Sequence, residues 1–400
     1  MSNDVILISV AGKDAPGITS RLTTILAQEP HAKLLDIEQT VVHKKLILSI
    51  LVSFGSKNHD RSTLLKELLF AANHLGVDIN FEVFDPRLLG EEESRHQYVI
   101  TCLGDEIGAE PLSRIAKTLA AKHINIDKIS KLTLRHIKAV ELLAHARKPI
   151  DAKRFSKELL ALSSELNIDI ALQQQSLLRR AKRLVVMDMD STLIQAEVID
   201  ELGKEAGVAQ KIGRITERAM RGEIGFAQSL KDRVKLLKGL KAGALDKVYR
   251  RIHLTPGAAR LIAVLKKLGY KIALVSGGFT YFTDKFKNKL GLDYAFANQL
   301  EIKNGLVTGK IIGTIVDAKR KAMILEMIAQ GEKISLDQVI AIGDGANDIP
   351  MLVKAGLGVA FHAKPRVRAK AQYAVSHHAG LDSILYLLGI SEKEIRHLSS

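Results

Sequence analysis

The chain has little of several features that define other classes of protein. Cys102 is the single cysteine among 400 residues, which excludes an internal disulfide framework and is typical of a reducing compartment. No apolar run approaches the roughly 18 residues that a membrane-spanning helix needs. The first residues, MSNDVILISV, lack a basic segment, and their apolar run is too short for a secretory signal. We therefore expect a soluble, cytoplasmic protein with no membrane partner.

Aromatic residues are also scarce, at 4% of the chain, and this bears on the formal net charge of +15. Lysines and arginines are scattered over helix-like segments such as KDRVKLLKGLKAG. Proteins that bind nucleic acids combine clustered basic residues with interleaved aromatics, and the sequence has no such block. The charge therefore favours a solvated basic surface that attracts anionic substrates, and it argues against a nucleic-acid partner.

The first half of the chain contains an internal repeat. The segments VILISV, ITSRLTTILAQ, LLDIEQTVV, LILSILVSF, STLLKELLFAANHLG and DINFEVF alternate in the order βαββαβ. The same order recurs between QYVITCLG and IDIALQQQ. Two copies of one topology predict two ferredoxin-like modules, at residues 1–86 and 95–176. The polar, turn-rich segment DPRLLGEEESRH is the expected linker between them.

From about residue 183, apolar strands alternate with helical patterns, which predicts an α/β domain with a Rossmann-like, doubly wound parallel sheet over residues 181–400. RLVVM precedes Asp188, KIALV precedes Ser276 and QVIAIG precedes Asp344. In such sheets the ligand crevice lies beyond the carboxyl ends of the strands. We therefore expect the three turns that follow these strands to converge on one site.

Two further segments interrupt this alternation. Residues 198–252 are helical in pattern, charged and free of strand signals, and a compact crossover does not need so much chain. An inserted helical cap is the simplest explanation. The segment EIKNGLVTG places Asn304 and Gly305 between apolar flanks, which predicts a β-hairpin.

The stretch RLVVMDMDST poses an electrostatic problem. Side chains alternate along an extended chain, so Asp188 and Asp190 would share one side and Met189 would take the other. Two like charges about 4 Å apart repel by roughly 4 kcal/mol at an effective dielectric near 20. Either a cation offsets this cost or one carboxyl stays protonated.

Four motifs follow one another along the second half: DMDST, SGG, a lysine within AKRKAMIL, and GDGAND. In this order they resemble the haloacid-dehalogenase-type phosphatases. The flanking segments DMDSTLIQAEVIDELG, GFAQSLKDRVKLLKGL and AIGDGANDIPMLVKAGLGVAF are similar to the phosphoserine phosphatase family over roughly residues 183–390. The N-terminal repeats resemble ACT domains, with GKDAPGIT matching the ligand loop of that family.

The resemblance implies a mechanism for the two acids. Asp188 would be the nucleophile that forms an aspartyl-phosphate, and Asp190 would be the general acid and then the general base. A Mg²⁺ ion would be held by Asp188, by Asp344 and by the backbone carbonyl of Asp190, and it would neutralise the crowded carboxylates. The remaining implied residues bind phosphate or support the metal and the lysine: Ser276, Gly277, Lys321 and Asn347 for phosphate, and Asp348 for support. Lys319 lies nearby, but RKAMILEMIA favours Lys321.

The resemblance also implies a substrate, O-phospho-L-serine, whose hydrolysis is the last step of serine biosynthesis. Arg233 would bind its carboxylate in a bidentate manner and Glu197 would receive its ammonium group. Met220 and Phe226 would line the pocket and exclude water when the cap closes. Without the resemblance, these four would be interpreted as ordinary surface and core residues of the cap.

For the N-terminal modules, the resemblance implies an amino-acid effector such as serine and a homodimer. Gly12, Asp14 and Gly17 in AGKDAPGIT are placed to hold the effector. The second copy has GDEIGAEPLS instead, with a differently spaced loop. The alternative is that these modules serve only in dimerisation.

Two other functions remain open on this sequence. One is a related phosphatase that acts on another small phosphate ester or on a phosphoprotein. Arg233 and Glu197 argue against it, because a sugar phosphate has no zwitterion for them to bind. The other is an amino-acid-sensing regulatory protein with an inactive phosphatase fold. The joint presence of Asp188, Asp190, Lys321 and Asp344 argues against the latter.

Overall fold

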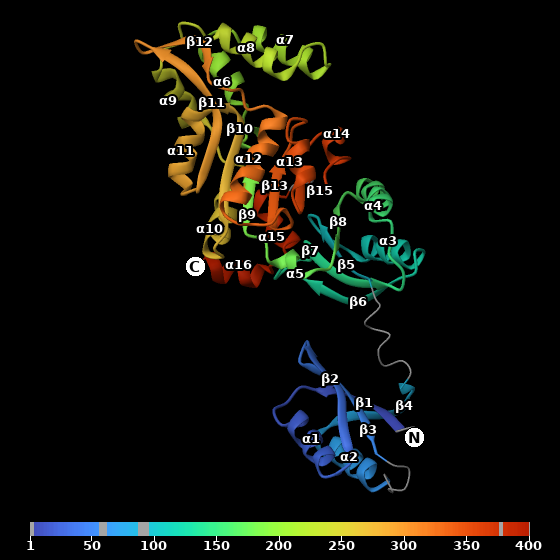
Figure 1. Ribbon diagram of the computed structural model, residues 1–400. Coiled ribbons are helices and arrows are strands. Elements are labelled where there is room, and N and C mark those ends of the chain that lie inside the picture. Colours follow the sequence, from blue (N-terminus) through green and yellow to red (C-terminus); the bar gives the residue numbers. More distant parts are fainter. Residues whose placement is uncertain (1–3, 56–61, 87–95, 376–378, 400) are drawn as a thin grey trace. The chain divides into compact units, whose positions relative to one another are not determined.

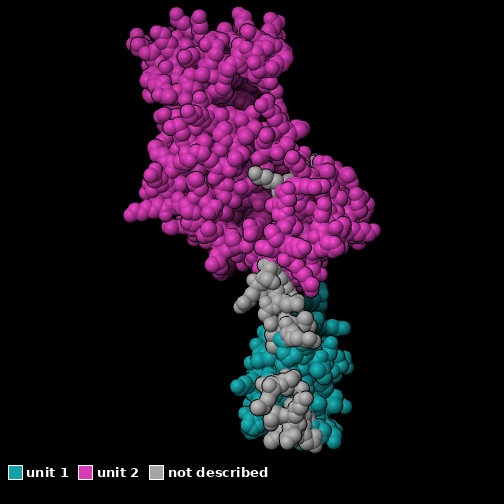
Figure 2. Space-filling model, turned by 45° about the vertical axis from the view of Figure 1, so that its right-hand side comes forward, with its two compact units in different colours: residues 1–95 teal, residues 96–400 magenta. Residues whose placement is uncertain are grey.

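The computed structural model describes residues 4–55, 62–86, 96–375 and 379–399 (Figure 1). The chain forms two compact units, residues 1–95 and 96–400, which are coloured separately in Figure 2. The expected linker lies almost entirely outside the described residues. Within the described part of the chain, no helix has the length and apolarity to span a bilayer.

The first unit is a four-stranded antiparallel sheet with two helices on one face (Figure 1). Strand order is β2-β3-β1-β4, and the inner strands β1 and β3 pack against both helices. This is the predicted ferredoxin-like βαββαβ topology. Its elements are β1 (Asp4–Lys13), α1 (Ile18–Ala27), β2 (Ala32–Val42), β3 (Lys45–Phe54), α2 (Ser62–Leu75) and β4 (Val77–Phe84).

The second unit begins with another copy of this topology, with strand order β6-β7-β5-β8. Cys102 is fully buried on β5, and burial raises the pKa of its thiol to about 12, so it is an apolar core residue. The elements are β5 (His96–Leu103), α3 (Ala109–Ala120), β6 (Ile124–Lys131), β7 (Ala139–Ala146), α4 (Ala152–Leu166) and β8 (Asp169–Gln174).

A seven-stranded, mainly parallel sheet follows, in the order β12-β11-β10-β9-β13-β14-β15. Its strands are β9 (Leu184–Met187), β10 (Lys271–Phe279), β11 (Tyr294–Lys303), β12 (Leu306–Ile312), β13 (Val339–Gly343), β14 (Leu357–Phe361) and β15 (Tyr373–Val375). The predicted fold class is confirmed. The predicted hairpin is also present: β11 and β12 pair in antiparallel fashion, and Asn304 and Gly305 between them have φ of 50° and 74°.

The sheet is buried on both faces because its strands are apolar throughout. On β9, Val185 and Met187 contribute to one core cluster and Leu184 and Val186 to the other. The first cluster contains α10 (Ala258–Lys267) and α11 (Thr280–Leu290), and the second contains α12 (Ala318–Gly331) and α13 (Ile349–Lys354). Helices therefore cover both sides, which leaves the ends of the strands as the place for a site.

Four helices lie between β9 and α10, in the segment predicted as a cap. They are α6 (Val198–Glu205), α7 (Ala209–Met220), α8 (Phe226–Leu236) and α9 (Gly243–Arg251). Figure 1 shows the β11–β12 hairpin beside α8. Backbone hydrogen bonds join the hairpin to the segment between α8 and α9: Gly239 donates to Val307 and Ala242 donates to Gly305, both over 2.8 Å.

The second ferredoxin-like module and the parallel sheet share one continuous core. Leu103, Leu132 and Ala171 of the module belong to the same cluster as Val185 and Met187 of β9. The short helix α5 (Leu177–Arg180) connects them, and two more short helices complete this end of the unit, α15 (Ile384–Leu387) and α16 (Glu392–Ser399).

A buried arginine of α5 reinforces this connection. Arg179 pairs with Glu141 of β7 and donates to the Gln173 side chain over 3.0 Å. Gln173 in turn donates to the carbonyl of Leu387 over 2.9 Å. Residues 96–400 therefore behave as one packed body.

Candidate active site

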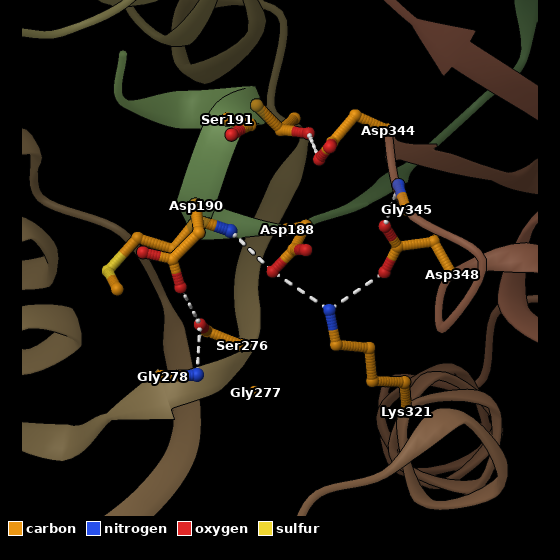
Figure 3. A network of polar contacts seen from close by, with 12 residues as sticks. Asp188, Asp190, Ser191, Ser276, Gly277, Gly278, Lys321, Asp344, Gly345 and Asp348 are labelled. Atoms are coloured by element: carbon orange, nitrogen blue, oxygen red, sulfur yellow. Dashed lines mark hydrogen bonds and ion pairs between the residues drawn. The ribbon is translucent and has the colours of Figure 1, made fainter. Parts of the chain in front are cut away.

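The topology of the sheet brings three of the predicted motifs together. β9 is paired in parallel with β10 on one side and with β13 on the other. Asp188 and Asp344, which directly follow β9 and β13, therefore meet Ser276 of β10 at one edge (Figure 3). Lys321, from the first turn of α12, points into the same group (Figure 3).

The chain turns sharply after β9. The strand ends at Met187, and the Oδ1 atom of Asp188 accepts a hydrogen bond from the backbone of Met189 over 2.7 Å. Residues 189–193 form a π-helical turn in which Ser191 has φ of 55°. The alternation expected of an extended strand therefore does not apply to Asp190. Both carboxyls reach the site because the turn carries Asp190 back over the strand ends.

The SGG motif departs from expectation in a similar way. β10 does not end before Ser276 but continues to Phe279, with a shift in its register against β11 between Val275 and Phe279. Close packing explains the glycines, because a Cβ on Gly278 would lie 2.8 Å from the Oδ2 atom of Asp190. Asn298, which the sequence reasoning missed, donates to the Gly277 carbonyl over 2.8 Å. A single asparagine in the apolar segment YAFANQLEI was the available signal.

Lys321 neutralises the centre of the site. Its fully buried Nζ atom lies 2.8 Å from Asp188 Oδ1 and 2.7 Å from Asp348 Oδ1. Burial opposes the charge on Lys321, but Asp188 and Asp348 outweigh it and hold the lysine pKa above its usual value. Burial and Asp348 raise the pKa of Asp188, against the opposing effect of Lys321. Because a single buried cation faces several acids, the site can accommodate further positive charge.

Asp190 has a different environment from Asp188. Its Oδ1 atom accepts from the backbone of Val198 over 2.9 Å, and its Oδ2 atom accepts from the Ser276 hydroxyl over 3.2 Å. Burial, and then the charge of Glu197, raise the pKa of Asp190 to about 7. Such a carboxyl can both donate and accept a proton near neutral pH, which is the requirement for a general acid and base.

Three carboxylates could hold a metal ion. Asp188, Asp344 and Asp348 each offer an oxygen, and these atoms lie within 4.8 Å of one another. Thr192, a residue that the sequence reasoning missed, donates to Asp344 Oδ1 over 3.0 Å. An all-oxygen, acidic set suits a hard divalent cation. The carboxyl group of Asp190 is not part of this set, whereas Asp348, expected only in support, is.

The charge on Asp344 gives a pH-dependent prediction. Burial, and then Asp348, raise its pKa to about 7 from a usual value near 3.8. The folded state therefore binds this proton more tightly than the unfolded state does. As a result, the free energy of unfolding falls as the pH rises from about 4 to about 7. In EDTA, the free energy of unfolding of Asp344→Asn should increase relative to that of the unsubstituted protein as the pH is raised from 5 to 8.

Urea unfolding at the two pH values measures this difference. In Mg²⁺ we expect the order at pH 8 to reverse, because the substitution removes one of the three carboxylates that could hold the ion. A difference that does not change with pH in EDTA would contradict the charged state assigned to Asp344.

The substrate-binding residues predicted in the cap lie around the same space. Arg233 on α8 is half-buried and donates to the Ser229 carbonyl over 3.3 Å and to Thr216 Oγ1 over 3.4 Å. Glu197 accepts from the Ser191 hydroxyl over 2.8 Å. Burial lowers the pKa of Arg233, against the effects of nearby acids that include Glu197 and Asp190. These charges are therefore close enough to act on one ligand.

Burial raises the pKa of Glu197, against the effect of its hydrogen bond from Ser191. The residue is nevertheless exposed. Glu197 thus offers a carboxylate within electrostatic reach of Arg233, which suits recognition of an ammonium group.

The two apolar residues predicted for the pocket differ in their positions. Phe226 lies over the SGG motif, since a Cβ on Gly277 would be 2.9 Å from its ring. Met220 is 61% exposed at the end of α7, and its sulfur lies 3.7 Å from the Nζ atom of Lys364, which follows β14. Met220 thus contacts the rim of the core domain rather than a closed pocket. Asn347 is half-buried beside Gly345 in the loop after β13.

The candidate effector residues lie in the first unit and are described within it. β1 extends to Lys13, so Gly12 is a strand residue, and a Cβ there would lie 2.6 Å from the Val77 side chain. Gly17 has φ of 98° and begins α1, while Asp14 is exposed. Packing against β4 therefore explains Gly12 without a ligand.

Comparisons with known proteins agree with this arrangement. The model of haloacid dehalogenase-like hydrolases matches residues 185–353, and ACT-domain models match residues 4–82 and 94–173. A phosphoserine phosphatase of Streptomyces coelicolor is 42% identical, and the match covers 98% of this chain and 93% of that protein. A phosphoserine phosphatase of Mycobacterium tuberculosis is 39% identical, with 98% and 94% covered.

Solved structures give the same result. A haloacid dehalogenase family hydrolase from Salmonella enterica has a TM-score of 0.64 at 32% identity, with 73% of this chain and 98% of that chain covered. A probable phosphoserine phosphatase from Vibrio cholerae has a TM-score of 0.59 at 35% identity, with 77% and 90% covered. The chain therefore belongs to the phosphoserine phosphatase family of haloacid dehalogenase-like hydrolases, and it carries two N-terminal ACT domains.

Proposed function

We propose that this protein is a cytoplasmic, Mg²⁺-dependent phosphatase that hydrolyses O-phospho-L-serine to serine and phosphate, the final step of serine biosynthesis. One observation carries the proposal. Asp188 contacts the buried Lys321 and lies near Asp190, a second carboxyl of raised pKa, and the charges of Glu197 and Arg233 act on each other beside them. The set around Asp188 suits phosphoryl transfer. The pair of Glu197 and Arg233 suits a zwitterionic substrate.

The first half-reaction forms a bond between Asp188 and phosphorus. A carboxylate oxygen of Asp188 attacks, the bond from phosphorus to the seryl oxygen breaks, and Asp190 gives its proton to that oxygen. The protonated form of Asp190 is populated near neutral pH because its pKa is about 7. Serine leaves as the neutral alcohol, with its ammonium and carboxylate unchanged.

The second half-reaction uses the same acid as a base. Asp190 takes a proton from a water molecule whose oxygen attacks phosphorus, and the bond between phosphorus and Asp188 breaks. Lys321, the Ser276 hydroxyl and the Gly277 and Asn347 positions would hold the phosphoryl oxygens, whose charge must be stabilised in the transition state. Phosphate leaves and both carboxyls return to their starting states.

Asp188, Asp344 and Asp348 would hold the Mg²⁺ ion, with the Asp190 carbonyl as a further oxygen ligand. The ion supplies positive charge that offsets repulsion between these acids and the phosphate. Asp348 is also held by Lys321 and by the backbone of Gly345, which donates to its Oδ2 atom over 2.9 Å. These contacts orient the set before any ligand arrives.

Release of phosphate from a panel of esters tests this function. The panel contains phosphoserine, phosphothreonine, phosphotyrosine, a phosphoserine peptide and glucose 6-phosphate. We expect a preference for phosphoserine, complete loss of turnover in EDTA, and recovery in Mg²⁺. Preference for the peptide or the sugar would support a different phosphatase, and no release from any ester would support the inactive amino-acid sensor.

Arg233 should determine substrate choice. Arg233→Met should lower kcat/KM for phosphoserine by about 100-fold, because the pairing of the half-buried guanidinium with the substrate carboxylate is lost. For p-nitrophenyl phosphate, which has no carboxylate, the change should stay within about threefold. Arg214→Met, at an exposed position of α7, is the matched control and should resemble the unsubstituted enzyme. Equal losses on both esters would show that Arg233 does not recognise the carboxylate.

We also propose that the protein is a homodimer whose ACT domains bind a small amino acid such as serine. β2 is an edge strand of the first unit and has apolar side chains that are 43–53% exposed: Leu34, Leu35, Ile37, Val41 and Val42. An exposed apolar edge strand favours association with another chain. Sedimentation of the full chain measures its mass in solution, and a monomer at micromolar concentration would contradict the dimer.

A further inference from the structure

One buried side chain of β11 is bonded to two different elements beside the active site. Asn298 is 1% exposed. Its Nδ2 atom donates to the Gly277 carbonyl over 2.8 Å, and its Oδ1 atom accepts from the backbone of Val316 over 2.8 Å. Because a buried donor or acceptor is costly to leave unpaired, these two bonds fix the amide and hold its partners in place.

The first partner lies in an irregular segment of β10. The register of β10 against β11 shifts between Val275 and Phe279, so that three residues of β10, 276–278, lie opposite one residue of β11. Irregularities of this kind beside an active site re-aim side chains. The Asn298 amide bonds to the middle residue of the segment, Gly277, and therefore ties this departure from regular pairing to β11.

The second partner lies directly before α12. Val316 is buried and precedes Asp317, the N-cap residue of the helix, whose Oδ1 atom accepts from the backbone of Arg320 over 2.8 Å. The backbone of Lys321 donates to the Asp317 carbonyl over 2.9 Å. The start of α12 is thus held by its own hydrogen bonds, and the contact with Asn298 sets where that start lies against the sheet.

The two elements that Asn298 joins each carry a residue of the proposed phosphate site. The Ser276 hydroxyl donates to Asp190 over 3.2 Å, and the Nζ atom of Lys321 lies 2.8 Å from Asp188. Figure 3 shows Ser276 and Lys321 reaching this group of acids from different elements. The spacing between the hydroxyl and the ammonium group therefore depends on how the irregular segment of β10 is held against the start of α12.

This spacing has little tolerance. A Cβ on Gly277 would lie 3.8 Å from the Val316 carbonyl and 2.9 Å from the ring of Phe226, so the segment is closely packed between the start of α12 and the cap. In enzymes, a misplacement of about 1 Å can lower the rate about 100-fold. A bond that fixes the segment therefore has a direct consequence for turnover.

We propose that Asn298 is a positioning residue for the phosphatase reaction. It fixes the irregular segment of β10 against the start of α12, so that Ser276 and Lys321 hold one phosphoryl group. Both halves of its amide are bonded within the protein, so Asn298 acts through these residues and not on the substrate. The inference rests on the proposed function, because it assigns Asn298 a part in the same site.

Steady-state kinetics of Asn298→Ala on phosphoserine and on p-nitrophenyl phosphate test this role. The value of kcat should fall about 100-fold for both esters, because both carry the phosphoryl group that is misplaced. KM for phosphoserine should stay within about threefold, because Glu197 and Arg233 are unchanged. A fall confined to phosphoserine, or a rise in KM at unchanged kcat, would overturn the role.

Failure of the proposed function would be visible separately. If the unsubstituted enzyme releases phosphate from p-nitrophenyl phosphate but not from phosphoserine, the proposed substrate is wrong. The comparison of variants on p-nitrophenyl phosphate then still decides the role of Asn298.

Leu300→Ala is the matched control for a general defect of β11. Leu300 lies two residues further along the same strand and is also buried. Its substitution should lower the thermal midpoint at least as much as Asn298→Ala does, because it leaves a cavity in the core. Its kcat, measured well below both midpoints, should nevertheless stay within about twofold of that of the unsubstituted enzyme. Equal losses of kcat in the two variants would show that Asn298 only supports the fold.

Asn298→Asp tests the bond to Gly277 in a side chain of the same size. The carboxylate keeps the acceptor for Val316 but has no donor for the Gly277 carbonyl, whereas the protonated carboxyl has one, and burial favours the protonated form. The kcat of Asn298→Asp relative to that of the unsubstituted enzyme should therefore rise as the pH falls from 8 to 6. The same ratio for Asn298→Ala should not change with pH. A ratio independent of pH in both variants would show that this bond does not position the site.

Discussion

Asp188→Asn should lower kcat for phosphoserine by roughly 10⁴-fold or more, because an amide cannot form the acyl-phosphate bond. The substitution changes little else, since Asn keeps the size of the side chain and can retain the contact with Met189. Burial, and then the charge of Asp348, raise the pKa of Asp188, so removal of its charge relieves both desolvation and repulsion. The thermal midpoint in EDTA should therefore not fall substantially. Steady-state phosphate release and circular dichroism measure the two effects.

The control is another aspartate that differs only in its location. Asp284 on α11 is exposed, and Asp284→Asn should leave both turnover and stability unchanged. Trapping of a covalent phosphate on the unsubstituted enzyme, and its loss in Asp188→Asn, would add direct evidence. Full activity in Asp188→Asn would overturn the nucleophile assignment and with it the two half-reactions.

Lys321→Met should have the largest effect on stability. The fully buried Nζ atom contacts two buried carboxylates, and its removal leaves them facing each other without a cation. Breaking a buried ion pair in this way costs about 3–5 kcal/mol in the free energy of unfolding. Turnover should fall by roughly 10³-fold, because the variant loses the charge that is proposed to stabilise the phosphoryl oxygens.

The pH dependence of this variant gives a further check. Asp188 has a raised pKa even beside Lys321, and without the lysine it should take up a proton more readily. The loss of stability in urea unfolding should therefore be smaller at pH 5 than at pH 8, and Mg²⁺ should restore part of it. Lys319→Met, two residues earlier and exposed, should be neutral in both assays. A larger loss in Lys319→Met than in Lys321→Met would exchange their roles.

The division of labour between Asp188 and Asp190 follows from their surroundings. Lys321 touches Asp188 and lowers the pKa of that carboxyl against the effects of its burial and its acidic neighbours. Asp190 instead meets a hydroxyl, a backbone amide and the acidic Glu197, and its pKa of about 7 allows proton transfer. The proposed roles of nucleophile and proton carrier therefore go to two chemically identical side chains in different surroundings, of which only Asp188 contacts the lysine.

Much of the fold followed from local patterns in the sequence. The apolar runs before Asp188, Ser276 and Asp344 predicted three strands because a strand buried on both faces must be apolar throughout. The pair Asn304 and Gly305 predicted a hairpin because both positions need positive φ. The family resemblance added the roles of Asp190 and Lys321, which spacing alone does not supply.

Other features depended on contacts between distant segments. The positions of Thr192 and Asn298 as hydrogen-bond donors to Asp344 and Gly277 have no signal in their own neighbourhoods beyond a polar residue in an apolar run. Met220 was expected to line a pocket, yet it is exposed beside Lys364. Whether an apolar cap residue is covered depends on how the cap and the core are placed, which no local pattern specifies.

By itself, the sequence determined the two repeated modules, the order of the catalytic motifs and the strands that carry them. These depend on periodicity and on neighbouring residues, so they can be inferred from the linear chain. Only the tertiary structure decided that the turn after β9, rather than strand alternation, brings Asp190 to the site, and that the second ACT domain shares a core with the catalytic domain. Both outcomes arise from packing between segments remote in the chain, where burial and charge are decided by the partner across the contact.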